Sequence, residues 1–250
     1  MDIADSVVLV AGGASGLGFV VVRRLTEVGA TAVVLDTRPV EPGALQGDSV
    51  HEVIGDVCEE RDVAAALNRA AELGSLRAVV NCAGIDRTGL TLDVSGPLPL
   101  EQFAQVVQVN LVGAFNVIRL AAERMARLEV VAGERGVIVN TGSIAGFDAP
   151  AGMVSYVASK AGLAGMTLAA ARDLAGARIR VVTVAPGMFD TPMFARLPDF
   201  ARRASLARVP HPARLGAPAE FAELVAHVIH NPMLNGETIR VDAAARLGGP

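Results

Sequence analysis

Short apolar runs of strand length alternate with longer helical patterns along almost the whole of the 250-residue chain. We expect strands at residues 6–10, 31–35, 50–54, 78–81, 136–141, 180–184 and 238–241, and helices at about 17–28, 60–73, 101–128, 154–174 and 219–230. This alternation is typical of repeated βα units, whose strands run parallel and whose crossovers are right-handed. The sequence therefore predicts an α/β fold, a Rossmann-type doubly wound parallel sheet of about seven strands with helices on both faces.

Two stretches interrupt the alternation. Residues 86–100 contain Gly and Pro and are expected to form a loop before the long helical segment. Residues 187–218 follow the sixth strand, beyond the carboxyl ends of the strands, where ligands bind in such sheets, and we interpret them as a substrate lid. No internal repeat or linker is visible in the sequence, so residues 1–250 are expected to form a single domain.

Charge and composition argue against several classes of function. The net charge is −4 with both signs interspersed, which argues against binding to nucleic acid or to a membrane surface. No apolar run approaches the roughly 18 residues of a membrane span, and the acidic N-terminus does not resemble a secretory signal, so we expect a cytoplasmic protein. Cys58 and Cys82 have no metal-ligand spacing, and His227 and His230 lack a third ligand, so no metal is expected.

A glycine-rich turn follows the first strand. Gly12, Gly16 and Gly18 lie between a strand and a helix, where backbone N–H groups and the positive helix end can face a pyrophosphate. A plain glycine-rich turn remains the alternative, because the spacing differs from the GxGxxG of other dinucleotide folds. Asp36 ends the second strand, where a carboxylate accepts hydrogen bonds from ribose hydroxyls and repels a 2′-phosphate. The glycine turn together with Asp36 favours NAD over NADP, although the nearby Arg38 is able to accommodate a phosphate.

The single tyrosine and the single lysine of the chain are four residues apart. Tyr156 and Lys160 share one face if the segment is helical, and the alternative is a surface pair. A phenol has a pKa of about 10, and lowering it to about 7 so that it accepts an alcohol proton requires about 4 kcal/mol. One ammonium about 4 Å away supplies that much at an effective dielectric of about 20. Ser143, at the end of the fifth strand, is expected to hydrogen-bond the reacting oxygen.

Together these motifs resemble the short-chain dehydrogenase/reductase family over nearly the whole chain. The matching positions are Gly12-x3-Gly16-x-Gly18, Asp56-Val57, Asn81-Cys82-Ala83-Gly84, Asn110, Ser143, Tyr156-x3-Lys160 and Pro186-Gly187. The resemblance implies that Ser143, Tyr156 and Lys160 are catalytic, that Ser143 and Tyr156 contact the substrate, and that Asn110 holds a water in a proton relay. It further implies cofactor contacts from Gly12, Ser15, Gly16, Leu17, Gly18, Asp36, Asp56, Val57, Asn81, Cys82, Ala83, Gly84, Tyr156, Lys160, Pro186, Gly187, Phe189 and Thr191.

Within the family, the last third of the chain is most similar to the type-2 3-hydroxyacyl-CoA dehydrogenases. Segments 165–168, 185–189 and 231–237 carry this likeness. It implies NAD-dependent oxidation of 3-hydroxyacyl-CoA in fatty acid metabolism, activity on hydroxysteroids as well, and a homotetramer. We expect the apolar helix around 106–122 to form an interface of that tetramer. The predicted lid carries five arginines, which either meet CoA phosphates or form an ordinary solvated surface; they are Arg196, Arg202, Arg203, Arg208 and Arg214.

Two other functions remain open at this point. One is an NADPH-dependent 3-oxoacyl carrier-protein reductase, also of this family; Asp36 speaks against it, as does Ser15, where a basic residue would grip a 2′-phosphate. The other is a sensor or scaffold that binds NAD without turnover. The combination of Ser143, Tyr156 and Lys160 argues against that alternative, because a pure binder has no need of a tuned phenol.

Overall fold

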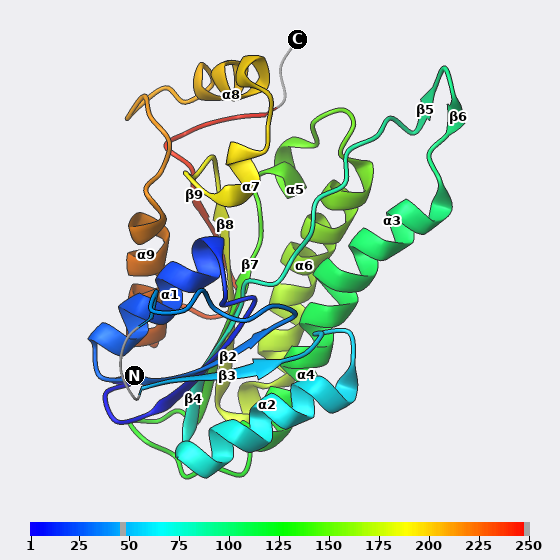
Figure 1. The fold of residues 1–250 in the computed structure, drawn as a ribbon. Coiled ribbons are helices and arrows are strands. Elements are labelled where there is room, and N and C mark those ends of the chain that lie inside the picture. Colours follow the sequence, from blue (N-terminus) through cyan, green and yellow to red (C-terminus); the bar gives the residue numbers. More distant parts are fainter. Residues whose placement is uncertain (46–48, 248–250) are drawn as a thin grey trace.

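A parallel sheet of seven strands forms the centre of the computed structural model, which describes residues 1–45 and 49–247 (Figure 1). The strands are β1 Val7–Ala11, β2 Thr31–Asp36, β3 Val50–Ile54, β4 Leu76–Asn81, β7 Gly136–Thr141, β8 Ile179–Pro186 and β9 Thr238–Val241. Their order is β3-β2-β1-β4-β7-β8-β9, and each neighbouring pair is parallel. The chain leaves β1 in one direction and returns beside it at β4, so the predicted doubly wound sheet is confirmed.

Helices cover both faces of the sheet. They are α1 Gly16–Glu27, α2 Glu60–Leu73, α3 Leu100–Val107, the π-helix η1 Gln108–Gly113, α4 Ala114–Met125, α5 Ala145–Asp148, α6 Val154–Asp173, the 3₁₀ turn η2 Ala175–Ala177, α7 Pro192–Ala195, α8 Asp199–Leu206 and α9 Pro218–His230. Alternate residues of the central strand β1 point to opposite faces: Val8 and Val10 pack with α1 and α9, whereas Val7 and Leu9 pack with α2 and α4. Continuous apolar strands are buried on both faces for this reason.

The long helical segment predicted at 101–128 is interrupted by a π-helical turn. Residues Leu100–Met125 are long and apolar enough to cross a bilayer by length and composition. The segment packs instead against α2, α6 and the sheet within the domain. The extra residue in η1 rotates the helix beyond it, and such bulges are frequent at functional sites. Asn110 lies in this turn.

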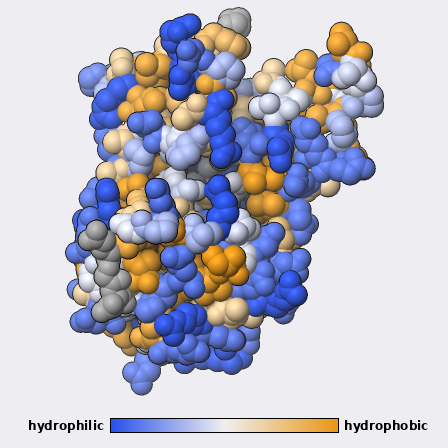
Figure 2. Space-filling model, viewed as in Figure 1, coloured by the Kyte–Doolittle hydropathy of each residue, from blue (hydrophilic) through white to orange (hydrophobic). Residues whose placement is uncertain are grey.

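The segment predicted as a loop at 86–100 contains a small hairpin. Strand β5 Leu92–Asp93 pairs antiparallel with β6 Gly96–Pro97. The hairpin projects from the body of the molecule (Figure 1). Its apolar side chains Leu92 and Val94 are exposed, and Figure 2 shows apolar surface on this projecting arm. The sequence did not show this pairing because each strand is only two residues long and has no apolar alternation.

The predicted lid, residues 187–218, carries the short helices α7 and α8 above the carboxyl ends of the strands (Figure 1). The C-terminal segment is bound to it. Arg208 of the lid donates a hydrogen bond from Nη1 to the carbonyl of Leu247 at 2.8 Å. Val209 and Ala245 pack with Ile144, which follows Ser143. The lid and the chain end therefore rest directly on the loop that carries a predicted catalytic residue.

Candidate active site

A cavity of about 590 Å³ opens at the carboxyl ends of the parallel strands. It is lined by the loops that follow β1, β2, β3, β4, β7 and β8, together with α6, α7 and the C-terminal segment. This is the position at which open α/β sheets bind their ligands, because the strand order reverses there and the loops diverge. The cavity therefore brings together residues that lie far apart in the sequence.

The turn after β1 is packed so tightly that only glycine fits at two positions. A Cβ on Gly12 would lie 2.4 Å from the backbone nitrogen of Ala83, and one on Gly18 would lie 2.1 Å from the carbonyl oxygen of Gly12. Gly12 and Gly16 have φ of +78° and +58°. The turn therefore holds the N-terminus of α1 against the cavity, where its partial positive charge faces any bound anion.

Asp36 lies beside this turn at the end of β2. Its Oδ2 accepts a hydrogen bond from Ala14 N at 3.1 Å, and its Oδ1 accepts one from Arg38 N at 3.2 Å. Both bonds fix the carboxylate at the cavity wall, and each oxygen retains acceptor capacity. The turn with Gly12, Gly16 and Gly18, called the glycine cradle below, fits the pyrophosphate of a dinucleotide, and the Asp36 carboxylate fits its ribose. Arg38 also lines the cavity and is exposed.

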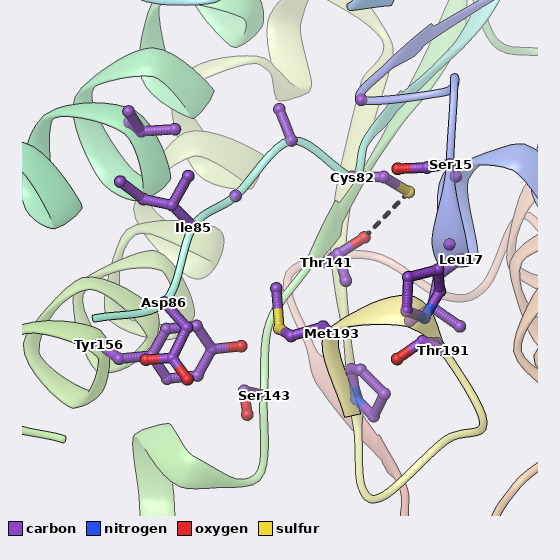
Figure 3. Close-up of a pocket in the computed structure, with 18 of the residues that line it drawn as sticks. Ser15, Leu17, Cys82, Ile85, Asp86, Thr141, Ser143, Tyr156, Thr191 and Met193 are labelled. Atoms are coloured by element: carbon purple, nitrogen blue, oxygen red, sulfur yellow. Dashed lines mark hydrogen bonds between the residues drawn. The ribbon is translucent and has the colours of Figure 1, made fainter. Parts of the chain in front are cut away.

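Further along the cavity, Cys82 accepts a hydrogen bond from the Thr141 hydroxyl at 3.2 Å (Figure 3). Burial raises the pKa of the Cys82 thiol to about 11, against the opposing effects of Thr141 and of the Lys160 charge. The thiol is therefore neutral and serves as a small wall residue. Asp56 and Val57 line the same cavity after β3. No group of three or more His, Cys, Asp or Glu side chains able to hold a metal occurs within residues 1–45 and 49–247.

Ser143, Tyr156 and Lys160 meet at the other part of the cavity. Tyr156 and Lys160 lie one turn apart on α6, and Lys160 Nζ is 5.6 Å from the centroid of the Tyr156 ring. Lys160 donates a hydrogen bond from Nζ to the carbonyl of Thr141 at 2.7 Å. Ser143 follows β7, and its Oγ accepts a hydrogen bond from Ala145 N at 3.1 Å. Figure 3 shows the Tyr156 hydroxyl pointing toward the loop that carries Ser143.

The electrostatics of Tyr156 differ from the sequence-based expectation. Burial raises the pKa of Tyr156 to about 12; the neighbouring Ser143 hydroxyl lowers it, and the Asp86 charge raises it further. Burial also lowers the pKa of Lys160 to about 8. The expected fall of the phenol pKa to about 7 is therefore wrong for the protein alone, because burial disfavours the phenolate and the Lys160 ammonium is hydrogen-bonded to the carbonyl of Thr141.

Two of the predicted site residues do not line the cavity. Asn81 is buried and donates from Nδ2 to Oδ1 of Asn140 at 2.8 Å, which joins β4 to β7. Asn110 accepts from Ile85 N at 2.8 Å and donates to Ile85 O at 2.9 Å and to Ser159 Oγ at 3.1 Å. Asn110 therefore fixes the loop after β4, directly behind the cavity wall. The other predicted cofactor and catalytic residues all line the cavity.

The cavity also contains residues that the sequence analysis did not select. Ile85, Asp86 and Arg87 continue the loop after β4, and Met193 projects from α7 (Figure 3). The rule that ligands bind beyond the carboxyl ends of strands could have identified the first three. Leu247 lines the cavity from the chain end, and no local sequence pattern indicates it.

The five lid arginines have different surroundings. Arg202 is paired with Asp199, and Arg214 with Glu220 at 2.7 Å, so these two guanidinium groups already have carboxylate partners. Arg196 lines the cavity and is exposed. Of the five, Arg196 is the one placed on the cavity wall.

A fold and a site of this kind define a nicotinamide-dependent dehydrogenase. Residues 6–201 match the family model for short chain dehydrogenase. The 3-hydroxyacyl-CoA dehydrogenase type-2 of Bos taurus is 49% identical over 96% of this chain and 95% of its own length. The crystal structure of 3-hydroxyacyl-CoA dehydrogenase type-2 from Mycobacterium avium superposes with a TM-score of 0.92 at 39% identity, over 97% of this chain and 96% of that one.

A second solved structure is informative about the cofactor. The 3-ketoacyl-(acyl-carrier-protein) reductase from Brucella melitensis, complexed with NADH, superposes with a TM-score of 0.86 at 27% identity, over 97% of this chain and 98% of that one. The chain belongs to the short-chain dehydrogenase family, and it is an oxidoreductase that uses a nicotinamide cofactor and acts on a small molecule.

Proposed function

We propose that this enzyme oxidises 3-hydroxyacyl-CoA to 3-oxoacyl-CoA with NAD as the hydride acceptor, and that it also acts on hydroxysteroids. The observation that carries the proposal is the meeting of Ser143, Tyr156 and Lys160 in one cavity whose far end carries the glycine cradle and Asp36. The likeness to 3-hydroxyacyl-CoA dehydrogenases over nearly the full length supports the choice of substrate. Carrier-protein reductases are less similar, at 32% identity for that of Thermotoga maritima.

The proposed chemistry divides between three side chains. The Ser143 hydroxyl hydrogen-bonds the substrate oxygen and holds the carbinol next to the phenol. Tyr156, once ionised, accepts the hydroxyl proton as the carbon loses its hydride. The oxidised nicotinamide, when bound, supplies the hydride acceptor and a positive charge at this end of the cavity. Lys160 adds a second cation 5.6 Å from the Tyr156 ring centroid, and both charges favour the phenolate over the phenol.

The proposed preference for NAD over NADP rests on Asp36. Its carboxylate lines the cavity and would lie against a 2′-phosphate, so NADP binding would bring two negative charges together. Arg38 also lines the cavity and is the cation that would oppose this preference; it lies two residues after Asp36 in the sequence, and its backbone N–H donates to the Asp36 carboxylate. Initial rates with each cofactor at saturating substrate measure the preference directly.

The lid arginines suggest how the CoA part is recognised. Arg196 lines the cavity, whereas Arg214 is held by Glu220. We propose that Arg196 meets a CoA phosphate. Arg196→Gln is expected to raise the KM for 3-hydroxybutanoyl-CoA about ten-fold, the order of one lost charge-assisted contact, and to leave the KM of its N-acetylcysteamine thioester unchanged. Arg214→Gln is the matched control. Equal effects on both substrates would remove the phosphate assignment.

A homotetramer is the second part of the proposal. Val112 of η1 and Phe115 of α4 are apolar and nearly half exposed on the long helical segment. A second copy covering this face would bury them, which supports the interface expected around 106–122. A light-scattering mass near four protomers supports the proposal, and one near a single protomer contradicts it. Cytoplasmic localisation and the absence of nucleic-acid and membrane partners stay predictions.

The deciding experiment is steady-state NADH formation with 3-hydroxybutanoyl-CoA, for wild type beside Tyr156→Phe. Removal of a general base is expected to lower kcat by about 10²- to 10⁴-fold. Turnover with NAD that collapses in the variant supports reaction, base and cofactor together. Tight NAD binding without turnover of acyl-CoA, steroid or simple alcohol by the wild type would contradict the proposal and favour a binding protein.

A further inference from the structure

Asp86 is an acidic side chain in the cavity for which the proposed mechanism has no use. It lies on the loop after β4 and lines the cavity together with Tyr156. Figure 3 shows its carboxylate at the Tyr156 ring, on the side away from Ser15, Leu17 and Thr191 of the cofactor end. It therefore faces the part of the cavity left for the substrate.

One oxygen of this carboxylate lacks a donor. Asp86 Oδ1 is buried, and no group within residues 1–45 and 49–247 donates a hydrogen bond to it. Buried carboxylate oxygens are normally hydrogen-bonded, because desolvation penalises a bare charge. Burial accordingly raises the pKa of the Asp86 carboxyl, while the Arg87 backbone N–H lowers it. A buried acceptor at a substrate cavity is explained most simply if the substrate brings the donor.

Asp86 does not assist the removal of the alcohol proton. Its charge raises the pKa of Tyr156, which disfavours the phenolate needed for that step. A residue that opposes the proposed base and yet occupies the cavity points to recognition as its role. In the proposed mechanism Ser143 and Tyr156 contact the reacting oxygen, so the donor that Asp86 accepts from belongs to another atom of the substrate.

We propose that Asp86 is a specificity residue that accepts a hydrogen bond from an uncharged donor, a hydroxyl or an amide N–H, a few atoms from the oxidised carbon. A bond from such a donor to a carboxylate is charge-assisted. A substrate with only acceptors or methylene groups at that place leaves the carboxylate unpaired and is disfavoured. If the substrate is the acyl-CoA of the proposed function, on which this part of the inference rests, the donor is the N–H of the pantetheine amide nearest the sulfur.

The test uses two pairs of alcohols, one for an amide N–H and one for a hydroxyl, so that these two kinds of donor are distinguished. The first pair is the N-acetylcysteamine thioester of 3-hydroxybutanoate and its S-pentyl thioester, which replaces the amide by carbon atoms. The second pair is trans-cyclohexane-1,2-diol and cyclohexanol. For each pair, the ratio of kcat/KM is measured with NAD for wild type and for Asp86→Ala. The wild type is expected to prefer the donor-bearing member of one pair about ten-fold, and the variant to lose that preference.

Asp173→Asn is the matched control. It makes a comparable change of charge on the helix that carries Tyr156, but at its last residue, about 25 Å away at 1.5 Å per residue. The control is expected to keep the wild-type ratio. The same ratio in wild type and Asp86→Ala for both pairs overturns the proposal.

If the wild type oxidises none of the four alcohols, the proposed function fails separately. The same pairs are then compared by their affinity for the NAD-bound protein, and the criterion for Asp86 is unchanged: a preference lost in Asp86→Ala supports the proposal, and no difference overturns it.

A second variant separates substrate contact from packing. Asp86→Asn keeps an acceptor oxygen but removes the charge, so it is expected to retain part of the preference. It is also expected to move the alkaline rise of kcat/KM to lower pH, because the carboxylate no longer raises the pKa of Tyr156. A purely structural role for Asp86 predicts that Asp86→Asn and Asp86→Ala both keep the wild-type ratio of kcat/KM for each pair, and that result overturns the proposal.

Discussion

Ionisation of Tyr156 is measurable in isolation, because it is the one tyrosine of the chain and the chain has no tryptophan. The ultraviolet absorbance that appears when a phenol ionises therefore reports a single side chain. Burial raises the pKa of Tyr156 to about 12, in spite of the Ser143 hydroxyl beside it. The difference from the ordinary value of about 10 corresponds to about 3 kcal/mol at about 1.4 kcal/mol per pH unit.

The same difference makes a prediction about stability. The pKa of the folded protein is raised above that of the unfolded chain, so the native state holds the proton more tightly. The contribution of Tyr156 to the free energy of unfolding is therefore fully present below about pH 10 and is lost as the pH rises through about 12. In Tyr156→Phe this part of the pH dependence is expected to disappear.

The assay titrates the free protein upward from neutral pH and records phenolate absorbance together with far-ultraviolet circular dichroism. We expect no phenolate below about pH 11 while the dichroism remains native, since an unfolded chain would ionise near pH 10. Saturating NAD is expected to lower the midpoint, because it brings a positive charge to the site. A phenolate signal at or below pH 10 in free protein with native dichroism would refute the argument from burial.

Three further predictions follow from particular contacts. Gly18→Ala places a Cβ 2.1 Å from the Gly12 carbonyl oxygen, and the forced shift is expected to cost about 1–3 kcal/mol in the free energy of unfolding. It is also expected to raise the Kd for NAD at least ten-fold by isothermal titration calorimetry; unchanged affinity counts against the role of the glycine turn. Asp36→Ser is expected to lower the ratio of kcat/KM for NAD to that for NADP by about 10- to 100-fold in initial-rate assays, and an unchanged ratio contradicts its ribose role. In the wild type, Arg180 Nε lies 2.9 Å from Oε2 of the buried Glu134. Arg180→Met leaves Glu134 without this partner and is expected to lower the free energy of unfolding by about 3–5 kcal/mol in denaturant titrations. A loss below about 1 kcal/mol contradicts this prediction.

The sheet was predictable because its strands are buried on both faces. Runs such as 31–35 and 136–141 are almost wholly apolar, and that pattern appears in the sequence without any knowledge of contacts. The glycine turn was predictable for a related reason, since close backbone approach leaves room only for glycine. The hairpin at Leu92–Asp93 and Gly96–Pro97 was not, because its pairing is fixed by two residues in each strand.

The composition of the cavity was predictable where strand ends carry polar residues, and less so elsewhere. Asp36 is the last residue of β2 and Ser143 lies two residues after β7, so their place was set by topology. Asp86 lies five residues beyond the end of β4, and its exposure depends on how the loop crosses the cavity. Leu247 reaches the cavity through a hydrogen bond to Arg208, a contact across 39 residues that no local pattern encodes.

The spacing of Tyr156 and Lys160 illustrates the limit most clearly. A separation of four residues places two side chains on one helix face, but it does not say where the ammonium points. In the structure Lys160 Nζ points to the Thr141 carbonyl at 2.7 Å, and its own burial lowers its pKa to about 8. Burial thus acts against both charged forms at once: it disfavours the phenolate and the ammonium by the same physics. If Tyr156 is the base, as proposed, we therefore expect part of the charge that stabilises its phenolate to come from what binds in the cavity, which predicts that proton removal is coupled to cofactor binding.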